Sequence, residues 1–302
     1  MTRGPDRIRV AAVQLQIVRP ASFAAWADRI ADLVRDAADT GADLVVFPEY
    51  GMLELTGMFE DAVAADASRA LAAIDTVLPE ALGHFAGLAA RARVHILAPS
   101  APEPGPDGRL RNVARLYTPA GGVGAQEKIV MTRFERDPWG IVGGGPVRVF
   151  DTALGRLGVA ICYDVEFPLI ARAMVEAGAE FILAPSCTDT LAGFHRVRTG
   201  ARARALEGQC VVVQVPTVGS APWSGTLDTN RGAAGFYGPS DDGFPDSGVI
   251  AQGPLDVDHV LVADIDRAAI RRVRTDGQVL TVAHWPDQGG GGNPPSVVVR
   301  LD

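Results

Sequence analysis

Residues 155–168 read GRLGVAICYDVEFP. The apolar run that ends at Cys162 has the composition of a strand, and Pro168 opens the helical stretch PLIARAMVEAG. A strand, a tight turn and a helix in this order expose the residue at the turn at the top of a sheet. The segment therefore predicts a nucleophilic Cys162, with helix N–H groups that lower the pKa of its thiol. The alternative is a buried structural cysteine.

The same alternation of strands and helices extends over the rest of the chain. Apolar strand-like runs occupy 7–15, 42–50, 94–100, 112–119, 180–186, 209–219 and 259–266, and helical patterns occupy 24–41, 81–93 and 195–208. Interleaved elements of this kind predict an α/β fold in which helices cover the faces of a sheet. No Pro/Gly-rich linker divides the chain, so we expect one domain over 1–302, with a flexible glycine-containing tail over about 286–302.

Composition and charge exclude several classes of protein. The 302 residues are 47% hydrophobic and carry a net charge of −8, which argues against a nucleic-acid partner. No apolar run reaches the roughly 18 residues of a membrane span, and the N-terminus lacks a signal-peptide pattern. Three sparse cysteines fit a reducing compartment better than a disulfide framework. We therefore expect a cytoplasmic protein that does not bind membranes.

Lys128, in the segment AQEKIVMTRFERD (125–137), is the only lysine among 28 lysines and arginines. An ammonium on a flexible stem suits proton transfer or a small oxyanion better than a planar guanidinium does. The composition therefore indicates a site at Lys128, and the alternative is a surface lysine of no special role.

Glu49 closes the apolar strand LVVFP. Desolvation at the edge of a hydrophobic element raises the pKa of a carboxyl group, as a general base near neutral pH requires. The alternative is a solvated carboxylate at the rim of the sheet.

Other polar residues are weaker candidates. Ser186, Cys187 and Thr188 follow the strand EFILAP, where loops of α/β folds line pockets, so contact with substrate and plain packing remain open. His195 is interpreted as a residue at a helix start or an interface rather than a catalytic base. Glu207 is expected to form a buried ion pair with the arginines of RARALEG (202–208).

Neither a metal nor a cofactor is expected. The five histidines show no paired metal-ligand spacing, and the three cysteines add none. The GGGP run at 143–146 precedes a strand and lacks the GK[ST] ending of a phosphate-binding loop.

Three segments together resemble the signatures of the nitrilase superfamily of carbon–nitrogen hydrolases. They are FPEYG (47–51), EKIVMTRFE (127–135) and GRLGVAICYDVEFP (155–168), and the similarity extends over most of the chain. The resemblance implies a four-layer α-β-β-α sandwich. It also matches Glu49, Lys128 and Cys162 to the Glu-Lys-Cys triad, and Glu135 to the second glutamate of the family.

The resemblance further implies a thiol amidohydrolase that acts on a small amide or carbamoyl compound, with the Tyr163 N–H as an oxyanion donor. The CYD form at Cys162 is similar to the amidase and carbamoylase branches, whereas true nitrilases tend to have CWE. Leu169 departs from the glutamate that many relatives have there. The alternatives are a nitrilase or a catalytically silent binding module. Relatives pair through the helix after the nucleophile, which implies a homodimer or larger homo-oligomer.

Overall fold

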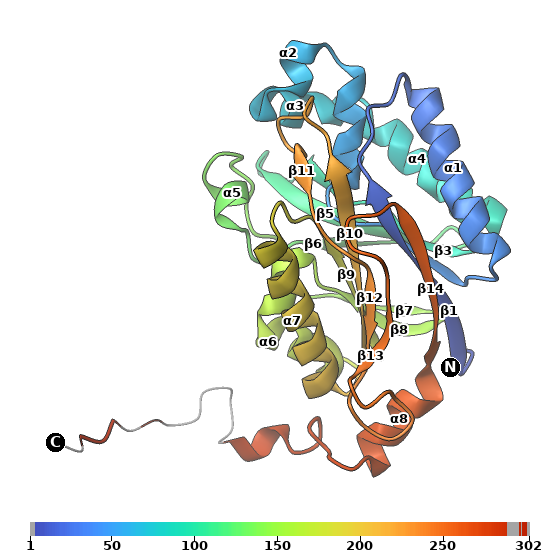
Figure 1. Ribbon diagram of the computed structural model, residues 1–302, viewed down its shortest axis with the longest axis vertical. Helices are drawn as coiled ribbons and strands as arrows, with labels where there is room; N and C mark the ends of the chain where they lie inside the picture. The colour runs from blue at the N-terminus through green and yellow to red at the C-terminus, as the bar shows by residue number, and fades with distance from the viewer. Residues whose placement is uncertain (1–3, 289–295, 297, 301–302) are drawn as a thin grey trace.

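Two β-sheets lie face to face in the computed structural model, which describes residues 4–288, 296 and 298–300 (Figure 1). The first sheet is built around β1 and contains β1 (Arg7–Gln16), β2 (Leu44–Val46), β3 (His95–Leu97), β4 (Ala101–Pro104), β5 (Leu110–Tyr117), β6 (Val123–Glu127) and β14 (His259–Asp266). In this sheet β1, β2 and β3 are parallel, while β5 and β14 run antiparallel to their neighbours.

The second sheet is built around three parallel strands. It contains β7 (Val149–Thr152), β8 (Gly155–Val159), β9 (Phe181–Ser186), β10 (Val211–Ser220), β12 (Gly235–Tyr237) and β13 (Val249–Gln252), and the short β11 (Thr229–Asn230) pairs with the end of β10. The last residues of β1 pair in parallel with β10 and join the two sheets along one edge. As a result, β1, β2, β3, β8, β9 and β10 all point their carboxyl ends in the same direction.

Helices cover both outer faces of this pair of sheets (Figure 1). The helices α1 (Phe23–Asp39) and α4 (Leu78–Ala92) pack on the first sheet, and α6 (Pro168–Glu176) and α7 (Leu191–Gly208) pack on the second. Helix α1 packs on the first sheet through one apolar stripe at helical spacing, formed by its buried residues Trp26, Ile30, Val34 and Ala37.

Strand β1 separates the layers of the core. Its side chains alternate, so Ala11, Val13 and Leu15 face the layer of α1 and α4, whereas Ile8, Val10 and Ala12 face the second sheet. On the far side, a Cβ at Gly158 of β8 would lie 2.4 Å from Met174 Sδ, so the glycine permits the close approach of α6. The predicted four-layer α-β-β-α sandwich is confirmed.

Several short elements were not expected from the sequence. They are η1 (Gly51–Met58), α2 (Asp61–Ala64), α3 (Ala67–Ala73), η2 (Ile74–Thr76), α5 (Arg133–Arg136), η3 (Cys162–Glu166), α8 (Arg267–Asp276) and η4 (Trp285–Gln288). Most of the tail predicted over 286–302 lies outside the described residues, which omit 289–295, 297, 301 and 302. None of the helices in the described ranges is long and apolar enough to cross a membrane.

Candidate active site

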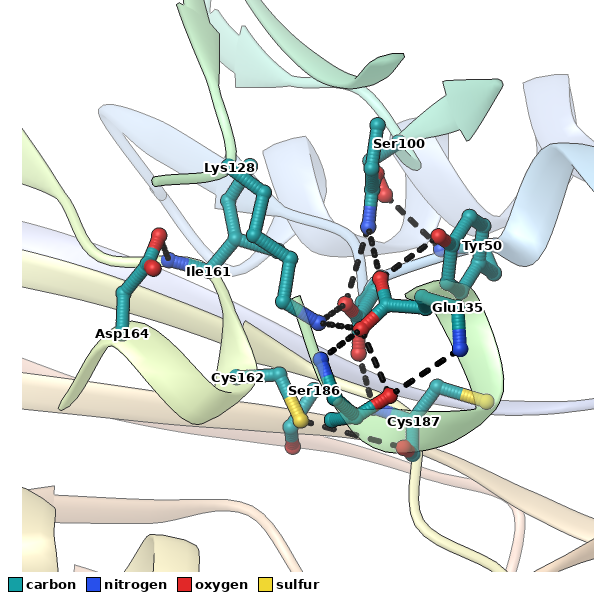
Figure 2. A network of polar contacts seen from close by, with 12 residues as sticks. Tyr50, Ser100, Lys128, Glu135, Ile161, Cys162, Asp164, Ser186 and Cys187 are labelled. Carbon is teal, nitrogen blue, oxygen red and sulfur yellow. Dashed lines mark hydrogen bonds and ion pairs between the residues drawn. The ribbon is translucent and has the colours of Figure 1, made fainter. Parts of the chain in front are cut away.

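The candidate residues lie at strand ends that face one another between the two sheets (Figure 2). Glu49 follows β2 of the first sheet, Lys128 follows β6, and Cys162 follows β8 of the second sheet. Glu135 belongs to α5, on the loop after Lys128. The common direction of the parallel strands brings these segments to one edge of the sandwich, as in other α/β folds.

Cys162 occupies a sharp turn. Its φ of 49° lies in the left-handed region that residues with a side chain rarely adopt, a form of backbone strain that concentrates at functional sites. The Asp164 carboxylate holds this turn by accepting hydrogen bonds from the N–H groups of Ile161 at 3.2 Å and of Val130 at 2.8 Å. Asp164 thereby ties the turn of the nucleophile to the loop that follows Lys128.

The expectation that helix N–H groups lower the pKa of Cys162 is wrong. Helix α6 begins only at Pro168, and the thiol instead donates a weak hydrogen bond to the Cys187 carbonyl, with an Sγ–O distance of 3.8 Å. Burial, together with the negative charge of Glu49, raises the pKa of Cys162 well above its ordinary value, although Lys128 opposes this. The resting thiol is therefore neutral and needs a base.

Glu49 is a buried acidic side chain of the same cluster. Its side chain is 1% exposed, and burial raises its pKa to about 7, with the charge of Glu135 adding to the effect and Lys128 opposing it. Glu49 Oε1 accepts hydrogen bonds from Lys128 Nζ at 2.7 Å and from Asn112 Nδ2 at 2.9 Å. Glu49 Oε2 accepts a bond from the Cys187 N–H at 2.9 Å. The predicted rise in the pKa of Glu49 is confirmed, and the solvated-rim alternative is wrong.

Lys128 is buried between two carboxylates. Its Nζ lies 2.7 Å from Glu135 Oε2 as well as 2.7 Å from Glu49 Oε1 (Figure 2). Burial alone would lower the pKa of the ammonium, but the two carboxylates together raise it well above its usual value. The alternative of a surface lysine is therefore wrong.

Glu135 is held in place from two sides. The Thr132 N–H and hydroxyl donate to its Oε2 at 2.9 and 2.8 Å, in the capping box that begins α5, and the Tyr50 hydroxyl donates to its Oε1 at 2.7 Å. Burial tends to raise the pKa of Glu135, but Lys128 and the Tyr50 hydrogen bond lower it below the ordinary value. Glu135 therefore remains ionised beside Lys128.

Sequence reasoning missed Asn112, Tyr50 and Asp164. All three are buried, and each bonds to a candidate residue or to its loop. The available signals were weak. Asn112 is an amide at the start of the apolar segment NVARLY, Tyr50 directly follows Glu49, and Asp164 comes shortly after Cys162. None of these signals identifies a partner, because the contacts join segments far apart in the chain.

The three weaker candidates differ from one another. The Cys187 N–H reaches Glu49, whereas its thiol lies 3.6 Å from Asn230 Oδ1. The Thr188 hydroxyl donates to the Arg231 carbonyl at 2.7 Å, and the Ser186 hydroxyl donates to a strand carbonyl of β10 at 3.4 Å. The structure thus brings the main chain of Cys187 to the site and uses both hydroxyls to hold the backbone.

Residues outside the site match their sequence interpretations in part. His195 is exposed on the first turns of α7. Arg204 is buried and pairs with the half-buried Glu207 at 3.0 Å, but Arg202 donates to the Ser247 carbonyl instead. Over the described residues, no cluster of three or more His, Cys, Asp or Glu side chains is arranged to hold a metal ion.

The family model of carbon-nitrogen hydrolases matches residues 9–275. The chain belongs to the carbon-nitrogen hydrolase family. This carbon-nitrogen hydrolase is 33% identical over 274 residues to a probable hydrolase of Bacillus subtilis, a match that covers 90% of this chain and 52% of the relative. The chain therefore spans about half the length of that relative.

A second relative and a solved structure extend the comparison of this hydrolase. A bifunctional nitrilase/nitrile hydratase of Nicotiana tabacum is 28% identical over 274 residues, covering 84% of this chain and 76% of the relative. A variant of the amidase from Nesterenkonia sp. AN1, of the nitrilase superfamily, shares the fold with a TM-score of 0.68 and 23% identity, covering 89% and 94% of the two chains. In that variant the acetamide moiety of fluoroacetamide is added covalently to the active-site cysteine.

Proposed function

We propose that this carbon-nitrogen hydrolase is a thiol amidohydrolase, which cleaves a small non-peptide amide or N-carbamoyl compound through a thioester on Cys162. The observation that carries the proposal is the buried Glu49 carboxylate, whose pKa burial raises to about 7 and which accepts a hydrogen bond from the N–H of Cys187, the residue whose carbonyl accepts a hydrogen bond from the Cys162 thiol. A base with this pKa is half ionised near neutral pH, where it can accept a proton and later return it.

The first half of the reaction forms the thioester. Glu49 takes the thiol proton while the Cys162 sulfur attacks the carbonyl carbon of the amide, and the carbonyl electron pair moves onto oxygen. When the tetrahedral intermediate collapses, the C–N bond breaks and Glu49 returns the proton to the departing nitrogen. Ammonia or an amine leaves, and the acyl group remains on sulfur.

Two N–H donors are suited to the oxygen on which negative charge develops. An ammonium has three N–H bonds, and Lys128 commits two of them to Glu49 and Glu135, which leaves the third for substrate. Among residues 4–288, the Tyr163 N–H has no main-chain or side-chain acceptor. Donors placed at such an oxyanion contribute about 3 to 4 kcal/mol each to the stability of the transition state.

The second half of the reaction consumes water. Glu49 removes a proton from a water molecule, whose oxygen attacks the thioester carbon, and the C–S bond breaks with return of the proton to sulfur. The products are a carboxylic or carbamic acid and the free thiol. Glu135 orients the Lys128 ammonium in both halves.

The enclosure of the site supports a small substrate. Cys162 is 4% exposed, and Glu49, Lys128 and Glu135 are still less exposed. A folded polypeptide cannot bring a peptide bond to such a sulfur without rearranging the walls of the site. Tyr50, which donates to Glu135, also packs edge-on against Trp139, with ring centroids 5.5 Å apart.

A nitrile is the second candidate substrate. The tobacco relative is a nitrilase and nitrile hydratase, and a thiolate can attack a nitrile carbon as it attacks a carbonyl carbon. A catalytically silent binding module is the alternative outside the enzymes. The assembled Glu49, Lys128 and Cys162 argue against it, because a binding module does not need a base beside a thiol.

Ammonia release from short aliphatic amides, N-carbamoyl amino acids and short nitriles tests these possibilities. We expect release from amides or carbamoyl compounds, loss of release in Cys162→Ala, and an acyl adduct on Cys162 in the intact-mass spectrum of the wild type. Release from nitriles alone would identify a nitrilase. Absence of turnover and of any adduct over the whole panel would contradict the proposal.

We also propose a cytoplasmic homo-oligomer, on the strength of its sparse cysteines and its exposed apolar side chains. Leu169 of α6 is 60% exposed and Leu206 of α7 is 47% exposed, and both lie on the helical layer over the second sheet. Burying such side chains against a second copy removes apolar surface from water.

A further inference from the structure

Asn112 touches three members of the site from the middle of β5. Its side chain is fully buried, and Nδ2 donates to Glu49 Oε1 at 2.9 Å and to Glu135 Oε1 at 3.4 Å. Its carbonyl oxygen accepts the Lys128 N–H at 2.8 Å. One residue therefore contacts both carboxylates through its side chain and the lysine through its main chain.

The side-chain oxygen of Asn112 indicates that packing alone does not explain why an asparagine occupies this position. Within the described chain, Oδ1 of Asn112 is buried without a hydrogen-bond partner. An unpaired buried acceptor is unfavourable, whereas leucine has the same branched arrangement of four side-chain heavy atoms without a polar atom. The feature that the site gains from asparagine is the Nδ2 donor, which leucine lacks.

We propose that Asn112 is a positioning residue whose amide donates to the ionised carboxylates of Glu49 and Glu135 at once, and so keeps Glu49 ready to take the Cys162 proton. The proposal rests on the role of Glu49 as the base. A neutral donor suits this place, because it reduces the repulsion between two carboxylates without adding a charge that would compete with Lys128.

The environment of Glu49 sets the direction of the expected effect. Five titratable groups surround it, namely Lys128, Glu135, Cys162, Tyr50 and Cys187. Two side chains donate hydrogen bonds to Glu49 Oε1. Lys128 is a cation, and the Asn112 amide is the neutral donor that stabilises the charged form of Glu49. Its removal disfavours ionised Glu49 and raises the pKa of that carboxyl group.

The test measures the rate at which iodoacetamide alkylates Cys162 between about pH 5 and 9, with the modified site located by mass spectrometry. Alkylation needs deprotonation of the thiol by Glu49 but no turnover. The variants are Asn112→Leu, which removes the donor, and Asn112→Asp, which keeps the shape and adds a carboxyl group. Leu116→Val is the matched control, because Leu116 is a buried residue of the same strand without a polar contact.

We expect the acid midpoint of the alkylation rate to move up by about one pH unit in Asn112→Leu, the scale of a lost hydrogen bond to a charged group. In Asn112→Asp it should move up at least as far, because a like charge adds to the loss. The limiting rate at high pH should stay near that of the wild type. Leu116→Val should lower the thermal midpoint without moving the acid midpoint.

An acid midpoint that stays at the wild-type value in Asn112→Asp, or that moves equally in Leu116→Val, would overturn the role of Asn112. The proposed amidohydrolase activity is judged by a separate measurement, the release of ammonia by the wild type. Failure of that activity leaves the alkylation profile measurable, so the two failures are distinguishable.

Discussion

The Lys128 ammonium lies 2.7 Å from Glu49 Oε1, and both side chains are 1% exposed. Removal of Lys128 would leave two buried carboxylates without their cation, which costs several kcal/mol, whereas removal of Glu49 leaves Lys128 paired with Glu135. Because Glu49 also contacts the Cys187 N–H, the pair links the first sheet to the strand ends of the second.

Lys128→Arg should fold but lose activity. A planar guanidinium keeps the charge, yet its fork would pair with Glu49 and Glu135, and its bulkier, rigid plane cannot occupy the point from which the ammonium directs an N–H bond at the oxyanion. We expect turnover to fall by at least about a hundredfold, the scale of losing one oxyanion donor, with a small change in thermal midpoint. Near-normal ammonia release by the purified variant would show that charge alone is sufficient.

Iodoacetamide should label Cys162 faster than Cys187 or Cys210 at neutral pH. Burial raises the pKa of Cys187 to about 12 and of Cys210 to about 11, and neither has a base placed to remove its proton. In Glu49→Gln the preference for Cys162 should disappear, because accessibility remains while the base is lost. Peptide mapping measures both results, and unchanged selectivity in Glu49→Gln would contradict the assignment of the base.

The pH profile of kcat/KM should show an acid limb near pH 7. The proposed mechanism requires ionised Glu49, whose pKa burial raises to about 7, so activity falls as pH decreases through that value. A carboxyl group with an ordinary pKa would place the limb near pH 4 to 5. Initial rates in constant-ionic-strength buffers distinguish the two positions, and a limb at the lower pH would contradict the raised pKa of Glu49.

Asp164→Asn should impair both stability and activity. The carboxylate accepts from the N–H groups of Ile161, Ile129 and Val130, whereas an amide offers one acceptor oxygen and turns a donor group toward the others. We expect a loss of about 2 kcal/mol in the free energy of unfolding, the scale of an unsatisfied buried donor, and at least about a tenfold loss of turnover. Denaturant titration and ammonia release measure these effects, and wild-type values in both would show that the carboxylate does not hold the turn.

Light scattering at micromolar concentration should give a mass of at least twice the 31.7 kDa of one chain. Leu206→Asp should reduce the assembly, because it places a charge on the exposed apolar layer of α7. Val123→Asp is the control, since Val123 is 57% exposed at the start of β6. A monomer mass for the wild type, or equal dissociation in both variants, would refute the proposed interface.

The sequence by itself determined the main strands and helices and the turn at Cys162. These features rest on local patterns, namely alternation with a period of two in strands, a period of 3.6 in helices, and a proline at the first position of α6. Lys128 was likewise visible from composition alone, since it is the only lysine of the chain. Local patterns also placed Glu49 at a strand end, where burial raises the pKa of a carboxyl group.

Only the tertiary structure decided what surrounds these residues. Asn112 and Glu49 lie 63 positions apart, and Glu49 and Cys187 lie 138 positions apart, so no local pattern reveals their hydrogen bonds. The pKa of Cys162 was predicted with the wrong sign for the same reason. The strand-to-helix turn suggests a stabilised thiolate, but burial between two sheets and the nearby charge of Glu49 favour the neutral thiol, and these are properties of the packed core.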